Sequence, residues 1–457
     1  MTLRERIESH LDELVACLQG VIQIPSVYAD DDSGYPYGLA VHQSLEYMLK
    51  AAGDLGFQTW NMDNQLGWCE YGEGEEMVAV LGHLDVVPEG DGWTVPPYGG
   101  VVKDGRIYGR GTMDDKGPLV AALYALLAIK EAGIPLKRRV RILFGLNEET
   151  GSADMKYYNA NGGEAPVMGF TPDGEYPVIN GEKGLITEGF RCELKQSGAL
   201  KLTEITGGAA HNIVPDYAKA RFACDPELAA QLCALEAEKI CCTATEDGLL
   251  VEAFGVSAHG GTPEQGVNAI GRLFLFLDRL PLEGDLKKAV SLIAGRIGLE
   301  WNGESLGVAM RDEVSGEFTF NLGVVRGDET GLEVKLSYRY PVTKSFEQCG
   351  PQVRAAFEEA GFVQTMIIHK KGLYVSPDSD LIRKLLTVYA DCTGLPTFPK
   401  SIGGGTYAKM LPNVVAFGPV FPGDEVREHK ADEYMELSRL ADNATIMAEA
   451  ILALAGQ

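Results

Sequence analysis

The stretch MVAVLGHLDVVP, residues 77–88, places an apolar run directly before a histidine and an aspartate. A short, continuous apolar run is typical of a strand that is covered on both faces. A second run, RRVRILFGL, occupies residues 138–146, and the segment between the two predicts a helix that begins near Gly117-Pro118 and ends at Gly133. Strand, helix and strand in this order predict an open α/β sheet, with a site beyond the carboxyl ends of its strands.

The pattern changes after about Gly184. Alternating segments such as LITEGFRCEL (185–194) and LKLTEIT (200–206) are accompanied there by an acidic helix at DPELAAQLCALEAEKI (225–240). Polar and apolar residues that alternate with a period of two favour antiparallel strands. This part of the chain is therefore expected to form an α+β domain.

The α/β pattern returns near Ser376. We predict a helix in SDLIRKLLTVYADCTG (379–394), a strand in NVVAFGPV (413–420) and a closing helix in EYMELSRLADNATIMAEAILALA (433–455). One domain is thus inserted into another. The expected architecture is a doubly wound, mostly parallel α/β domain with an inserted α+β domain. The α/β domain would consist of residues 1–183 and 377–457, and the inserted α+β domain of residues 184–376.

Composition and charge limit the partners. The chain has 457 residues, of which 45% are hydrophobic and 23% are charged, which is enough apolar material for two cores. With 65 acidic and 40 basic side chains, the formal net charge is −25. Because phosphate backbones and anionic membranes are also negative, nucleic acid and membrane partners are disfavoured.

Three further features predict a soluble, cytoplasmic protein. The longest apolar stretches, 118–129 and 444–455, are too short to cross a bilayer. Residues 3–21 predict a single amphipathic helix without the apolar core of a signal peptide. The nine cysteines are odd in number and form no CxxC pair, so we expect reduced, mostly buried thiols and no disulfide framework.

Candidate ligands first occur at the end of the first strand and before the helix. His83 and Asp85 stand at positions i and i+2, so an imidazole and a carboxylate would emerge on the same side, the carboxylate orienting the ring. GRGTMDDKGP (109–118) offers Asp114 and Asp115 in a glycine-rich turn. Each feature has a structural alternative, which is a strand-end histidine held by an acid in the first case and helix capping in the second.

More carboxylates follow the later strands. NEETG (147–151) offers Glu148 and Glu149, of which one can bind a metal while the other acts as general base. Asp173 follows an apolar segment, and His429 precedes the final helix. A solvated pair of acids, a turn-forming aspartate and a surface histidine are the alternatives.

The set as a whole points to metal chemistry. Two histidines and three carboxylates, each beside an expected strand end or turn, supply the imidazole and oxygen ligands of a hydrolytic centre with two divalent cations. We expect zinc, but the residues do not fix the metal, because imidazole and carboxylate sites also accept manganese or cobalt.

Seven motifs in this order resemble the co-catalytic zinc peptidases related to aminoacylases, succinyl-diaminopimelate desuccinylases and carnosinases. The chain looks most like the PepV-type bacterial dipeptidases within that family, and the similarity runs from the N-terminal helix to the C-terminus. The motifs that carry it are HLDVVP, GDGW, GRGTMDDKGP, NEETG, FTPDGEYPVINGEKG, SAHG and GGGTYAK.

The resemblance implies a role for each candidate in the centre. Asp114 would bridge two metals, since the aspartate of the family stands two positions before the lysine of DxKG. His83 and Asp173 would complete one metal site, and Glu149 with His429 the other. Glu148 would be the base that deprotonates the attacking water, and Asp85 would orient His83.

The inserted domain would act as a lid and bind substrate. His259 matches a histidine that donates a hydrogen bond to the oxyanion. Asn212 looks like a second polar contact, and Arg339 matches an arginine that binds the C-terminal carboxylate of the substrate. The turn from GGGTYAK could offer backbone N–H groups to the same carboxylate, or merely open a helix, and its candidate residues are Gly403, Gly404, Gly405 and Thr406.

The resemblance also bears on substrate and assembly. Relatives with aspartate at the position of Asp173 tend to be aminopeptidases or dipeptidases, which favours a dipeptidase over an N-acyl amino acid deacylase, the alternative within the family. A non-catalytic peptide-binding protein is the alternative from another class, and it would be expected to lack ligands. The insert is longer than the domain through which dimeric relatives pair, so we predict a monomer whose lid closes over its own site by hinge motion.

Overall fold

The computed structural model describes residues 1–235 and 237–456, which form two compact units. Unit 1 consists of Met1–Asn180, Val375–Lys400 and the residues from Gly405 onward, and unit 2 consists of Gly181–Tyr374 and Ser401–Gly404. Each unit has its own apolar core. The roles of catalytic domain and lid remain predictions.

The main sheet of unit 1 has a parallel centre. Its strand order is β1-β2-β6-β3-β7-β24-β9, and the four central strands β6, β3, β7 and β24 run parallel while their neighbours pair antiparallel. This confirms the expected α/β class. The bounds are β1 (Gln58–Met62), β2 (Leu66–Tyr71), β6 (Arg139–Gly145), β3 (Met77–His83), β7 (Met168–Thr171), β24 (Val414–Ala416) and β9 (Ile179–Glu182).

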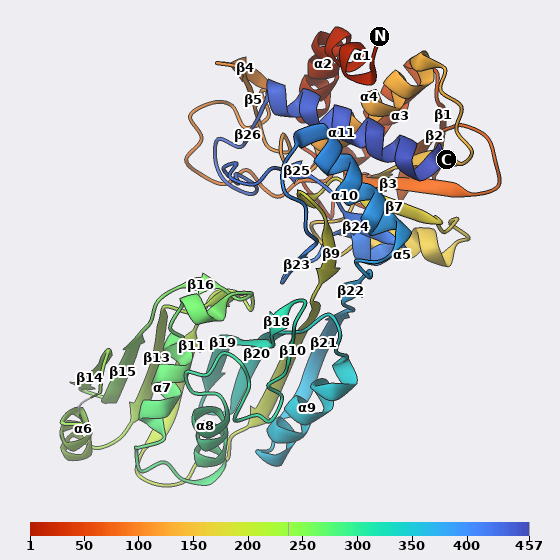
Figure 1. Cartoon of the computed structure of the whole chain (residues 1–457). Helices are drawn as coiled ribbons and strands as arrows, with labels where there is room; N and C mark the ends of the chain where they lie inside the picture. Colours follow the sequence, from red (N-terminus) through yellow and green to blue (C-terminus); the bar gives the residue numbers. More distant parts are fainter. Residues whose placement is uncertain (236, 457) are drawn as a thin grey trace. The chain divides into compact units, whose positions relative to one another are not determined.

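Helices cover both faces of this sheet (Figure 1). The connections β3–α4–β6 and β6–α5–β7 cross the sheet in opposite directions, so right-handed crossovers place α4 and α5 on opposite faces. Every residue of α4 from Lys116 to Ile129 is buried, as expected of a helix that is apolar all round. The helices are α1 (Leu3–Ser9), α2 (Leu11–Ile22), α3 (Leu39–Asp54), α4 (Lys116–Ala132), α5 (Ala153–Ala160), α10 (Asp380–Thr393), α11 (Leu437–Ala455) and the 3-10 helix η3 (Tyr407–Met410).

Short strands shape the loops around the sheet. Three of them form a small antiparallel sheet, β26-β5-β4, two pair in parallel, β25 with β8, and two pair with β9. Their bounds are β4 (Val101–Lys103), β5 (Arg106–Tyr108), β26 (Tyr434–Glu436), β8 (Gly174–Glu175), β25 (Pro419–Val420), β22 (Leu373–Tyr374) and β23 (Lys400–Ile402).

Unit 2 is an antiparallel sheet with helices along one face (Figure 1). In β13 buried and more exposed residues alternate, because one face of the sheet packs on the helices. In order across the sheet, the strands are β14 (Ile240–Thr245), β15 (Gly248–Phe254), β13 (Tyr217–Ala223), β11 (Lys201–Gly207), β19 (Thr319–Asp328), β20 (Gly331–Tyr340), β10 (Gly184–Glu193) and β21 (Val363–Lys370). The other elements are α6 (Pro226–Cys233), α7 (Ala269–Leu277), α8 (Gly284–Arg296), α9 (Gly350–Glu359), η1 (Pro263–Gln265), η2 (Phe346–Gln348), and the strand pairs β12 (Ile213–Val214) with β16 (Ala258–His259) and β17 (Arg311–Asp312) with β18 (Gly316–Glu317).

Some expected elements differ from the structure. The single helix expected at residues 3–21 is wrong, because the chain turns at His10 and its ring contacts Glu13 and Glu131 at 2.9 and 3.0 Å. The helix expected to reach Ile240 ends at Cys233, since Ile240 begins a strand that pairs with β15 and tertiary pairing overrides the helical pattern.

Two further expectations need correction. The strand expected at 413–420 is split into β24 and β25, since Pro419 has no N–H for a continuous ladder. All nine cysteines are free, but only four are buried, and Cys241 and Cys392 are exposed, so the expectation of mostly buried thiols is wrong. Among the residues that the structure describes, no helix is long and apolar enough to cross a membrane.

Candidate metal centre

The candidate ligands of unit 1 gather at the carboxyl edge of the central strands. His83 is the last residue of β3, Glu149 follows β6, and Asp173 follows β7. Because these three strands are parallel neighbours, their carboxyl ends meet at one edge of the sheet. Asp114 stands in the turn before α4, and His429 lies in the loop before β26.

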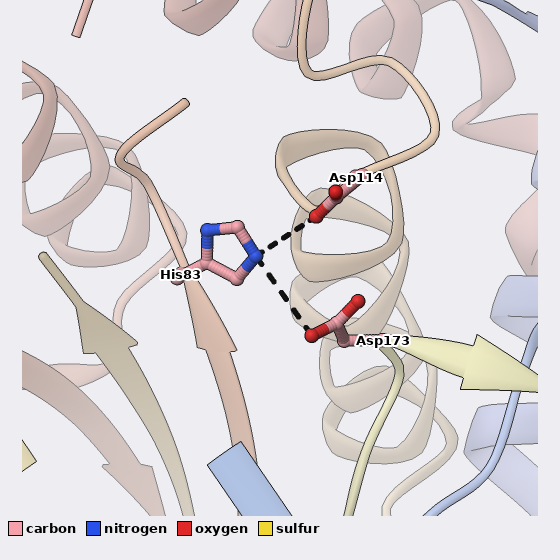
Figure 2. Close-up of side chains that lie close together, drawn as sticks. All are labelled: His83, Asp114 and Asp173. Carbon is pink, nitrogen blue, oxygen red and sulfur yellow. Dashed lines mark ion pairs between the residues drawn. The ribbon is translucent and has the colours of Figure 1, made fainter. Parts of the chain in front are cut away.

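The first potential cation site consists of His83, Asp114 and Asp173 (Figure 2). Nε2 of His83 lies 2.9 Å from Oδ1 of Asp114 and 3.9 Å from Oδ2 of Asp173. Figure 2 shows both carboxylates turned towards this one ring nitrogen. One imidazole and two carboxylates are thus arranged as ligands of a common cation would be.

The second potential site consists of Asp114, Glu149 and His429. Nε2 of His429 lies 2.9 Å from Oδ2 of Asp114 and 3.1 Å from Oε1 of Glu149. The two oxygens of Asp114 therefore face different histidines. This division is what a carboxylate that bridges two cations requires.

The hydrogen bonding of His83 tests whether a cation fits. Nδ1 of His83 lies 2.9 Å from the carbonyl oxygen of Asp85, so it is the nitrogen that donates. In the neutral tautomer with the proton on Nδ1, Nε2 carries a lone pair, and among the described residues it has no hydrogen-bond partner although an oxygen of Asp114 is only 2.9 Å away. A positive charge is needed between this lone pair and the carboxylate, and a proton or a divalent cation can supply it; an imidazole lone pair beside two carboxylates is a donor set that fits the cation.

Asp85 contacts His83 and also the loop after β6. Its carbonyl oxygen, rather than its carboxylate, accepts from His83, and the nearer carboxylate oxygen is 3.4 Å from Nδ1. The carboxylate instead accepts the backbone N–H groups of Glu148 and Glu149, each at 3.1 Å. Asp85 thus links the end of β3 to the loop that carries two further site residues.

The electrostatics of the centre favour cations. Burial raises the pKa of Glu148 to about 8, with further contributions from the negative charges of Glu149 and Asp114, while His83 opposes the shift. Burial, followed by the charge of Asp114, also raises the pKa of Asp173. A nearby divalent cation would lower both pKa values again, because it stabilises the ionised carboxylates.

Asp114 and Asp115 have different surroundings. Asp115 is buried, and its Oδ2 accepts the backbone N–H of His83 at 3.2 Å. A Cβ at Gly82 would lie 2.4 Å from this oxygen, so glycine is needed there for the close approach. Asp115 therefore supports the end of β3, and only Asp114 belongs to both potential cation sites.

Three of the candidate substrate-binding residues lie together in unit 2. The backbone oxygen of Asn212 accepts from Gly260 N at 2.7 Å, next to His259. A Cβ at Gly261 would lie 1.5 Å from Nη1 of Arg339 and 2.9 Å from Nδ1 of His259, so both side chains border this glycine. Arg339 is only 4% exposed, and within the described residues its Nε and Nη1 have no hydrogen-bond partner, which leaves donors for an anion.

The candidates of the glycine-rich turn are divided between the units. Gly403 and Gly404 belong to unit 2, and a Cβ at Gly403 would lie 3.6 Å from Nη1 of Arg339. Gly405 and Thr406 belong to unit 1, where the Thr406 hydroxyl accepts from Ala408 N at the start of η3. This contact fits the structural alternative, a turn that opens a helix, and the role of the turn in binding substrate stays a prediction.

Sequence reasoning missed a buried pair behind the Glu148 loop. The hydroxyl of Tyr407 donates to Asp154, whose carboxylate also accepts the backbone N–H of Leu146 at 2.7 Å. The same hydroxyl accepts the N–H of Asn147 at 3.1 Å. Tyr407 lies in the GGGTYAK motif, which was a signal, whereas Asp154 looks like an ordinary acid in the first turn of a helix.

Known proteins resemble the chain over nearly its whole length. The model of "Peptidase family M20/M25/M40" matches residues 79–453. "Putative dipeptidase YtjP" of Bacillus subtilis is 36% identical and covers 97% of both chains, and a "Putative dipeptidase" of Staphylococcus epidermidis is 32% identical and covers 99% of both. The crystal structure of human carnosine dipeptidase 1 matches with a TM-score of 0.58 and 16% identity, over 99% of this chain and 98% of that chain, which supports the fold.

We expect Tyr407→Phe to destabilise unit 1 by roughly 1–3 kcal/mol, because it removes the hydroxyl that donates to the buried carboxylate of Asp154 and leaves the N–H of Asn147 with Asp154 as its one acceptor. Urea unfolding would measure this by tryptophan fluorescence, since three of the chain's four tryptophans lie in unit 1. The matched control is Tyr157→Phe, whose hydroxyl bonds the exposed Asp63 and whose loss should cost under about 0.5 kcal/mol. Equal losses in the two variants would contradict the assignment.

Proposed function

The chain belongs to peptidase family M20/M25/M40, and on this premise we propose that it is a metal-dependent dipeptidase for dipeptides with a free N-terminus. One observation carries the proposal. The two oxygens of Asp114 each lie 2.9 Å from the ring nitrogen of a different histidine, as a bridge between two cations would need. The names of the relatives and their coverage of the whole chain support dipeptides as the substrate class.

We propose two divalent cations per chain, zinc in preference to manganese or cobalt. His83, Asp114 and Asp173 would hold one, and Asp114, Glu149 and His429 the other. Imidazole and carboxylate ligands accept all three metals, so availability contributes to the choice. When bound, such cations lower the pKa of nearby water and polarise a peptide carbonyl.

Each side chain of the site would then have its own role in the reaction. Glu148 takes the proton of the attacking water and passes it to the leaving amine. The carboxylate of Asp85 keeps Glu148 in place by accepting the backbone N–H of Glu148. In unit 2, Arg339 binds the C-terminal carboxylate, and His259 and Asn212 stabilise the developing oxyanion.

Two other functions are alternatives to a dipeptidase. An N-acyl amino acid deacylase would use the same cations and base, and Asp173 in place of a glutamate disfavours it. A non-catalytic peptide-binding protein is disfavoured by the ligand set, since all five candidates are present and gathered at one edge. A monomer with a hinged lid over residues 184–376, in the cytoplasm, completes the proposal.

Metal stoichiometry tests the bridge. Equilibrium dialysis against zinc should give two ions for the wild-type chain, one for His83→Ala or His429→Ala, and none at the same free zinc for Asp114→Ala, which contributes to both sites. His42→Ala is the control, because His42 stacks on Tyr35 outside these groups and its loss should leave two ions. A single ion in the wild-type protein, or one retained fully by Asp114→Ala, would refute a shared carboxylate.

Glu148→Gln tests the general base. The amide cannot accept the proton, so we expect kcat to fall by roughly 10²–10⁴-fold while both zinc ions remain bound. The measurement is steady-state hydrolysis of an alanyl dipeptide, with the zinc content of each preparation determined in parallel. Turnover close to that of the wild type with full zinc content would remove Glu148 from this role.

A comparison of kcat/KM for dipeptides and N-acetyl amino acids tests the substrate class. We expect alanyl dipeptides to be hydrolysed with a kcat/KM at least about 10²-fold above that of the matching N-acetyl amino acids, because dipeptidases and deacylases of this family differ in what they accept at the amino end. Quantifying the released amino acids measures both activities on one preparation. Preference for the N-acetyl compounds would establish the deacylase, and binding of dipeptides without cleavage would establish the non-catalytic alternative.

A further inference from the structure

A buried ion pair stands behind the metal centre of unit 1. Nη1 of Arg110 lies 2.6 Å from Oε2 of Glu433, and the side chains are 1% and 0% exposed. The desolvation of two charges costs several kcal/mol per ion, and good geometry with further hydrogen bonds is needed to compensate for it. The partners of these two residues therefore indicate what the pair does.

Glu433 holds the turn that carries Asp114. Its other oxygen, Oε1, accepts the backbone N–H groups of Gly111 at 3.0 Å, Met113 at 2.8 Å and Asp114 at 3.3 Å. The turn thus wraps around a single carboxylate oxygen. Because the amide of Asp114 itself is among the donors, this contact fixes the point from which the shared carboxylate projects.

The same pair fastens the other ligand-bearing segments. Glu433 lies four residues after His429 on one loop, and its backbone oxygen accepts from Gly109 N at 2.9 Å. Arg110 donates to the carbonyl oxygen of Lys430, next to His429, at 3.3 Å. It also donates to the carbonyl of Glu89 at 3.0 Å, on the segment that follows His83 and Asp85.

We propose that Arg110 and Glu433 are positioning residues that hold the turn of Asp114, the loop of His429 and the segment after β3 in the arrangement that binds two cations. This inference rests on the proposed metal site, and it assigns the pair a task beyond stability. Partners that orient metal ligands commonly contribute 10–100-fold to metal affinity, so the effect is measurable.

The test uses the affinity of the full-length protein for Co²⁺, measured by titration of its visible absorption, which depends on the geometry of coordination. The double variant R110M/E433M removes the pair without leaving an unpaired buried charge. We expect it to fold, to bind Co²⁺ 10–100-fold more weakly and to show an altered spectrum. E433Q retains an acceptor oxygen for the three amides and is expected to stay within several-fold of the wild type.

E188Q is the matched control, because Glu188 is also 0% exposed and hydrogen-bonded, but lies in unit 2. It should leave the Co²⁺ affinity and spectrum unchanged. A folded R110M/E433M protein with wild-type affinity and spectrum would overturn the proposal and leave the pair a purely stabilising role.

Hydrogen exchange of the wild-type protein supplies a measurement that needs no variant. The amides of Gly111, Met113 and Asp114 should be protected, and exchange at the rate of an open loop would also overturn the proposal. Neither readout requires turnover. If the wild-type protein bound cations but cleaved no dipeptide, the proposed activity would fail while the comparison of Co²⁺ affinities would still decide the role of the pair.

Discussion

The centre depends on one carboxylate that is shared between two histidines. The oxygens of Asp114 each lie 2.9 Å from a ring nitrogen, one belonging to His83 and the other to His429. Further acids converge on the same place, and the pKa values of Glu148 and Asp173 are raised first by burial and then by the negative charges of neighbouring carboxylates. Such a cluster is electrostatically satisfied by cations, so metal binding and the stability of this edge of unit 1 are linked.

A second set of carboxylates stands behind the first and explains why the ligands stay in place. Each member accepts backbone N–H groups of a segment that carries a candidate ligand or Glu148. The ligand positions are therefore defined through the backbone, which has fewer freedoms than a long side chain. The members of this set, with the N–H groups that they accept, are Asp85 (Glu148 and Glu149), Asp115 (His83), Asp154 (Leu146 and Asn147) and Glu433 (Gly111, Met113 and Asp114).

The candidate metal ligands could be predicted from the sequence, but most of the carboxylates that hold their backbone could not. A parallel strand brings its last side chain to the same edge as its neighbours, so His83 after MVAVLG and Glu149 after RILFGLN are expected to meet. Glu433 occurs in REHKADEYM, which reads as a solvated run of charges, and its burial depends on Arg110, 323 positions away. Asp85 was recognised beside the imidazole, but only the fold shows that its carboxylate also accepts N–H groups of the Glu148 loop.

The charge of the protein bears on its substrate. A dipeptide at neutral pH is a zwitterion without net charge, whereas an N-acyl amino acid carries one negative charge and is repelled by a chain with a net charge of −25. Because this repulsion is screened beyond about 8 Å at physiological salt, it acts mainly on encounter. Discrimination between dipeptides and N-acyl amino acids must therefore come from direct contacts between the substrate and the protein. Within the described part of unit 2, the buried Arg339 has Nε and Nη1 without hydrogen-bond partners, which is donor chemistry that suits a carboxylate. Dipeptides and N-acyl amino acids both carry a terminal carboxylate, so contacts of that kind cannot separate them, and the separation has to arise where the free amine differs from the acylated one.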